Sequence, residues 1–102
     1  YVEAARGLAT RMIREGGARP AERLRWGFQV VLARVPGATE QSVLLSRYRQ
    51  VLEYYKQHRK EATRLISVGE STAPKGIDDA QLAAYTVLAS LLLNLDETVM
   101  RE

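Results

Sequence analysis

The chain of 102 residues has no cysteine, a single histidine and a single tryptophan. Without cysteine there is no disulfide, no thiolate zinc site and no thiol nucleophile. The compartment stays open, because many exported domains also lack cysteine. His58 stands in a wholly polar stretch with no second group to orient it as a base, which is typical of a surface or helix-start residue. We therefore predict no catalytic residue, no metal site and no cofactor.

Charges of one sign do not form a run anywhere in the chain. The formal net charge is +3, and most of the basic residues are arginine. Arginines crowd the first quarter, but glutamates are interleaved with them, as expected of a solvated surface. We therefore predict no nucleic-acid partner. The longest apolar stretch, Ala83 to Leu95, is too short and too polar for a bilayer, which needs about 20 apolar residues. We expect no membrane insertion by this domain.

No segment alternates apolar and polar residues for long enough to predict a strand, whereas helical spacing recurs throughout. The first helix begins at the start of the chain and ends at Gly16-Gly17. Its polar face is predicted to carry Glu3, Arg6, Arg11 and Arg14. A second helix begins near Pro20 and stops at Pro36-Gly37. Its apolar stripe comprises Leu24, Phe28, Val31, Leu32 and Val35, with Trp26 nearly opposite Phe28.

Thr39 is the predicted N-cap of a third helix, and Tyr48 and Tyr55 lie on its apolar face. The polar stretch Lys56 to Lys60 leaves two alternatives open. The third helix either continues through it or breaks near His58, and the pattern slightly favours a break followed by a short fourth helix. The stretch Gly69 to Gly76 is predicted to be a loop.

The last helix is predicted to open at Asp78, with Gln81 three residues on as in a capping box. From Ala83 to Leu95 this helix is apolar on nearly all sides, which is typical of a buried helix. The chain is therefore predicted to be a single all-α domain, a compact array of four to five helices around a buried C-terminal helix.

Asn94 and Asp96 interrupt the last apolar run. One interpretation is that Asn94 ends the long helix and that Asp96 caps a short turn from Glu97 to Arg101. The other is that these residues lock a C-terminal turn onto the rest of a parent protein. Both interpretations require hydrogen bonds, because buried polar groups need partners. Asn94, Asp96 and Glu97 are thus candidate interaction residues.

Several strings of the sequence resemble one family, the planctomycete domain of unknown function at the C-terminal end of large exported proteins. They are Glu3-Ala4-Ala5-Arg6, Arg14-Glu15-Gly16-Gly17, Arg34-Val35-Pro36, Val68-Gly69-Glu70 and Leu92-Leu93-Asn94-Leu95-Asp96-Glu97. The resemblance implies an exported or periplasmic bacterial parent, often with a cytochrome c-like domain upstream, but it supplies no activity. The haem motif Cys-x-x-Cys-His is absent here, so haem is not carried over.

These observations predict a C-terminal fragment of a longer protein, acting as a non-catalytic structural or interaction module. Its partner would be the upstream domains of the same parent chain or another protein. Two alternatives remain open. The domain could be an accessory part of an exported enzyme, with Asp96 and Glu97 as its contribution. It could also be a carbohydrate- or ligand-binding module that uses Trp26 and Tyr54, the aromatic residues left outside the predicted core.

Overall fold

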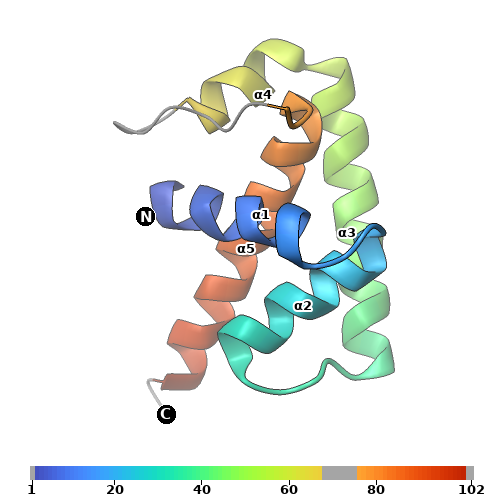
Figure 1. The fold of residues 1–102 in the computed structure, drawn as a ribbon, viewed down its shortest axis with the longest axis vertical. Helices are drawn as coiled ribbons and strands as arrows, with labels where there is room; N and C mark the ends of the chain where they lie inside the picture. Colours follow the sequence, from blue (N-terminus) through green and yellow to red (C-terminus); the bar gives the residue numbers. More distant parts are fainter. Residues whose placement is uncertain (1, 68–75, 101–102) are drawn as a thin grey trace.

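Helix α5 (Asp79–Met100) runs through the middle of the computed structural model and contacts each of the four other helices (Figure 1). The others are α1 (Val2–Glu15), α2 (Pro20–Leu32), α3 (Ala38–Gln57) and α4 (Arg59–Ile66). The structure describes the backbone of residues 2–67 and 76–100 and the side chains of residues 3–67 and 76–96, and no strand occurs in these ranges. The predicted all-α array around a C-terminal helix is confirmed.

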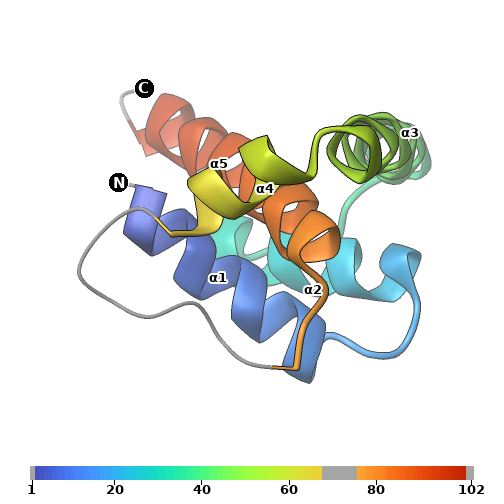
Figure 2. The ribbon, with the colours of Figure 1, turned by 90° about the horizontal axis from the view of Figure 1, so that it is seen from above.

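The other four helices are not distributed equally around α5. Figure 2 shows α1 and α2 on one side of α5 and α3 on the other, with α4 crossing near its start. The radius of gyration is 12.9 Å, which matches the value of about 13 Å for a folded domain of 100 residues. Each surrounding helix is amphipathic and covers part of α5 with its apolar face.

The start of α2 and the end of α1 follow the sequence prediction. Gly17 has a φ of 117°, a conformation open to glycine, and α1 ends directly before the Gly16-Gly17 pair. Pro20 occupies the first turn of α2. The end of α2 differs, because the helix stops at Leu32 and Ala33 takes a left-handed conformation with a φ of 57°.

The stop at Leu32 corrects the predicted boundary at Pro36-Gly37 and changes the role of Val35. Val35 lies beyond the helix and is 51% exposed, so it does not belong to the apolar stripe. The start of α3 also differs from the prediction. Gly37, not Thr39, is the N-cap, and the Glu40 carboxylate accepts the Gly37 N–H at 2.8 Å. Glutamate at the third helical position performs this function in a capping box.

The chain breaks at His58, as the sequence favoured, and α4 begins at Arg59. The Nδ1 atom of His58 lies 2.8 Å from the Tyr54 carbonyl oxygen, at the end of α3. The predicted loop from Gly69 to Gly76 falls outside the described residues except for Gly76. Asp78 caps α5 as predicted, since its carboxylate accepts the Gln81 N–H at 3.1 Å.

The core is built mainly from α5 and the faces of α1 and α2 turned toward it. Alanines at the crossing of α1 and α5 let the two helices approach closely, and bulky side chains fill the spaces on either side. Tyr48 of α3 stacks on Tyr85 of α5 with ring centroids 4.4 Å apart. The largest fully buried side chains are Tyr85, Phe28, Met12, Leu24, Leu82, Leu88 and Leu92.

The structure corrects the prediction that Arg6 lies on the exposed polar face of α1. Its side chain is buried, with 5% exposed, and it donates a hydrogen bond to the carbonyl of Ile66. The last carbonyls of a helix lack partners within the helix and carry partial negative charge. The end of α4 therefore draws this guanidinium into the interior, which spacing along α1 alone does not indicate.

Candidate functional site

One face of α5 is not covered by the other helices. Val87, Leu91 and Leu95 follow each other at intervals of four residues and so lie on the same side of the helix. Val87 and Leu91 are half-buried, and Leu95 is 41% exposed. The adjacent Leu88 and Leu92 are fully buried. The prediction of a buried helix is therefore correct for most of α5 and wrong for this face.

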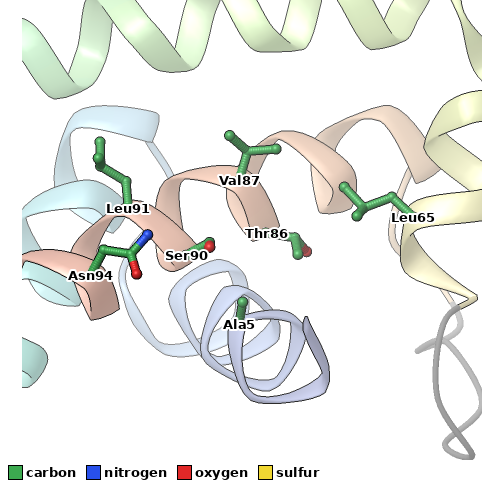
Figure 3. Close-up of a pocket in the computed structure, with 7 residues that line it drawn as sticks. All are labelled: Ala5, Leu65, Thr86, Val87, Ser90, Leu91 and Asn94. Carbon is green, nitrogen blue, oxygen red and sulfur yellow. The ribbon is translucent and has the colours of Figure 1, made fainter. Parts of the chain in front are cut away.

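The first half of this face forms a hollow of about 290 Å³ (Figure 3). Ala5 of α1 and Leu65 of α4 border it on opposite sides. Val87 and Leu91 project on the side of α3, as Figure 3 shows. The α5 residues that line the hollow are Thr86, Val87, Ser90, Leu91 and Asn94.

A second hollow of similar volume lies toward the end of α5, where Phe28 and the first two turns of α3 approach Leu91 and Leu95. Its lining is almost entirely carbon. Val43 of α3 stands at its edge with 59% of its surface exposed. Leu91 lines both hollows, so they form one continuous surface. We call these two hollows together the α5 groove.

The α3 end of the groove is held by an arginine–carboxylate clamp. Both terminal nitrogens of Arg34 donate to Glu40, at 2.9 and 2.8 Å. The Arg34 guanidinium also lies 4.9 Å from the centre of the Phe28 ring, in a cation–π arrangement. The hydrogen bonds from Arg34 and from the Gly37 N–H lower the pKa of Glu40 to about 2. The clamp therefore connects the turn after α2 to the start of α3.

Tyr54, a predicted interaction residue, lies where α3 meets α4. Its side chain is 47% exposed, but its hydroxyl donates to Glu61 and its ring stacks on His58 with centroids 4.2 Å apart. The hydrogen bond to Glu61 raises the pKa of the Tyr54 phenol. One ring face and the hydroxyl are thus already engaged, which leaves little of Tyr54 free to stack on a sugar.

Trp26, the second predicted aromatic, is half-buried in α2. The Arg11 guanidinium of α1 lies 5.1 Å from its ring centre. Neither residue lines the α5 groove. Trp26 contacts α1 through Arg11, whereas Tyr54 contacts His58 and Glu61 at the start of α4, so the two aromatic residues have different neighbours.

The remaining predicted residues all belong to α5. This helix continues to Met100, so Asn94 does not end it and Asp96 does not cap a separate turn, which corrects the first interpretation of these residues. Asn94 is exposed and lines the groove, whereas Asp96 is half-buried. The side chain of Glu97 lies outside the described residues. Of the two whose side chains are described, Asn94 lines the groove and Asp96 does not.

The titratable groups outside the groove were compared with the requirements of a metal site. Within the described residues, no group of three or more acidic or histidine side chains is placed to hold a metal ion. The Tyr85 hydroxyl is buried and has no hydrogen-bond partner of good geometry in that part of the chain. Burial raises the pKa of the neighbouring Tyr48 well above its ordinary value. No described helix combines the length and the apolar character needed to cross a membrane.

Sequence reasoning missed the exposed Val43 and Leu95 and the half-buried Val87 and Leu91. A signal for them existed, because α5 is apolar on nearly all sides and such a helix needs neighbours on nearly all sides. Four helices that each supply one apolar face leave part of its 22 residues uncovered. Val43 is an apolar residue that falls outside the apolar face of α3, which is a second signal.

Comparisons with known proteins add no relative. No protein-family model matches the chain, and neither the curated proteins nor the solved structures give a significant match.

Proposed function

We propose that this domain is a non-catalytic interaction module that holds a protein partner in the α5 groove. The observation that carries the proposal is the apolar surface of the half-buried Leu91 and the exposed Leu95 on the central helix, where Leu91 lines two largely apolar hollows. Contiguous exposed apolar surface marks binding sites more often than scattered single residues do. A groove between helices is suited to the apolar face of a partner helix.

The polar groups of the groove support binding over catalysis. General acid–base chemistry needs a titratable group within hydrogen-bond reach of the substrate. Among the described residues that line the groove, the only ionisable side chain is Glu40, which is held as a carboxylate by Arg34. Thr86 donates its hydroxyl to the Leu82 carbonyl at 2.7 Å and so is engaged within the helix. Ser90 and Asn94 are the other polar residues of α5 that line the groove, and neither carries a titratable group.

The resemblance to the planctomycete C-terminal domain supports a particular partner. It indicates that the domain belongs to a larger exported bacterial protein, whose upstream region would then fill the groove. In this proposal the domain stabilises or orients the assembled protein and performs no reaction itself.

Calorimetric titration of the domain with the separately expressed remainder of its parent tests this function. We expect micromolar or tighter binding by the unmodified domain and loss of binding in Leu91→Asp. Val30→Asp is the matched control, because Val30 is 45% exposed on α2 and lines neither hollow of the groove. Binding that survives Leu91→Asp, or no binding by the unmodified domain, would overturn the proposal.

A further inference from the structure

We infer that the occupant of the α5 groove is an amphipathic helix that carries acidic residues on the flank facing α3 and α4. This inference rests on the proposed function, since it specifies the chemistry of the partner. Two observations carry it: the shape and spacing of the apolar contacts, and the placement of two exposed arginines beside them.

The apolar contacts have the spacing that a helix requires. Val87 and Leu95 are eight residues apart on α5, which corresponds to about 12 Å along the helix axis. Leu65 of α4 extends the apolar surface near Val87, and Val43 of α3 extends it near Leu95. A docked helix could place its side chains i, i+4 and i+7 between these apolar residues, and the contact would extend over more than two helical turns.

The flank formed by α3 and α4 is basic. Arg47 shares a hollow with Val43, and Arg64 shares one with Leu65. Both arginines are exposed, and neither forms an ion pair with any residue in the described ranges. Glu61 lines the same hollow as Arg64, and its carboxylate, which accepts a hydrogen bond from the Tyr54 hydroxyl, offsets part of this positive charge. Two guanidinium groups against one carboxylate leave this flank with a net positive charge, and both guanidinium groups are available for new pairs.

The residues that line the groove on the side of α1 and on its floor carry no charge. Ala5 borders the groove on the side of α1, while Ser90 and Asn94 supply the polar atoms of its floor. Arg6, the residue next to Ala5, is buried and directed to the Ile66 carbonyl. The positive charge is consequently one-sided, which predicts both the sign of the partner's charge and the flank that carries it.

A second copy of the chain fits this surface less well. In a two-fold symmetric dimer the same patch meets itself. If the axis crosses the groove, Arg47 and Arg64 face the same arginines of the other copy, and if the axis runs along the groove they face its Ala5 side, where no lining residue is acidic. Like charges that face each other across an interface oppose association. An acidic helix neutralises both arginines while covering the same leucines.

The test uses three fluorescein-labelled helical peptides of about 18 residues, or 27 Å when helical. All three peptides carry leucines at i, i+4 and i+7. They differ only in the residues that flank this leucine stripe, which are glutamates in the first peptide, glutamines in the second and lysines in the third. Fluorescence anisotropy measures their affinity for the domain. Two exposed ion pairs should favour the glutamate peptide over the glutamine peptide by about 2- to 30-fold. This preference should increase at low salt.

The double variant Arg47→Glu with Arg64→Glu should reverse the preference in favour of the lysine peptide. The control is Arg14→Glu with Arg25→Glu, which changes net charge equally at exposed residues outside the groove. This control should keep the preference for glutamate. Equal affinity for the three peptides, or a preference that the first double variant does not alter, would overturn the inference.

Two further outcomes separate this inference from the proposed function. If the parent remainder binds through Leu91 but none of the peptides does, the interaction module stands and the acidic helix is wrong. If sedimentation shows a dimer that Leu91→Asp dissociates, or if anionic lipid vesicles bind where the peptides do not, the occupant is a second copy or a membrane surface and the inference is wrong. If neither peptides nor remainder bind, both proposals fail.

Discussion

The buried Arg6 of α1 and the Ile66 carbonyl at the end of α4 are joined by a hydrogen bond across 60 residues of sequence. The bond connects the first helix to the last turn before the segment that leads into α5. It satisfies a helix-terminal carbonyl with a charged donor, and hydrogen bonds of this kind contribute more than neutral ones. The pair is therefore a specific stabilising contact of the fold.

Replacing Arg6 with Met should lower the free energy of unfolding by about 1.5–3 kcal/mol, because the carbonyl loses a charged donor while the apolar stem is retained. Urea denaturation measures the change. Arg11→Met is the control, since Arg11 lies in the same helix in an exposed pair with Glu15. Its effect should stay within about 1 kcal/mol. Equal losses in both variants would contradict the assigned role of Arg6.

Adjacent leucines of α5 should respond differently to the same substitution. Leu92 is fully buried, so Leu92→Asp removes about 1.5–3 kcal/mol of apolar burial and also buries a carboxylate. We expect this variant to be unfolded by far-UV circular dichroism. Leu91→Asp, on the half-exposed face, should retain the helical spectrum and a cooperative melting transition. An unfolded Leu91→Asp would show that the groove belongs to the core.

The Arg34–Glu40 clamp predicts a pH dependence of stability. The pKa of Glu40 is lowered from 4.5 to about 2 in the folded chain, so its stabilising contribution is complete above about pH 4.5 and is lost as the pH falls toward 2. The melting temperature of Glu40→Gln should be below that of the unmodified domain at pH 7, and the difference should vanish over this window. Glu53→Gln, at an exposed position of the same helix outside the clamp, is the control. A difference that persists at pH 2 would show that the clamp does not act through charge.

Two glycines should respond to alanine with opposite signs. A Cβ at Gly16 would lie 2.9 Å from the Arg23 Cα and even closer to the Met12 carbonyl, both backbone atoms. Gly16→Ala should therefore lower the free energy of unfolding by about 1–3 kcal/mol. Gly7 lies within α1 with no atom within 4 Å of an added Cβ, so Gly7→Ala should raise it by about 0.5–1 kcal/mol. Chemical denaturation of both variants measures the difference, and changes of the same sign would be inconsistent with this packing.

The sequence by itself determined the helices and most of their ends. Gly16-Gly17, Pro20 and Asp78 act through local backbone geometry and through side chains a few residues away, so their effects can be predicted from short windows. The break at His58 follows from a polar stretch between two apolar patterns. The central position of α5 follows from its composition, because a helix apolar on nearly all sides is stable only when other helices cover it.

The tertiary structure decided which apolar and polar residues are covered. Whether Leu91 is exposed depends on where α1, α3 and α4 end and how they cross α5, and these are long-range relationships without a local signature. For the same reason Arg6 is buried, since its partner Ile66 lies in a distant helix. The groove, and with it the candidate function, arises from the incomplete cover that the four other helices give to the largely apolar α5.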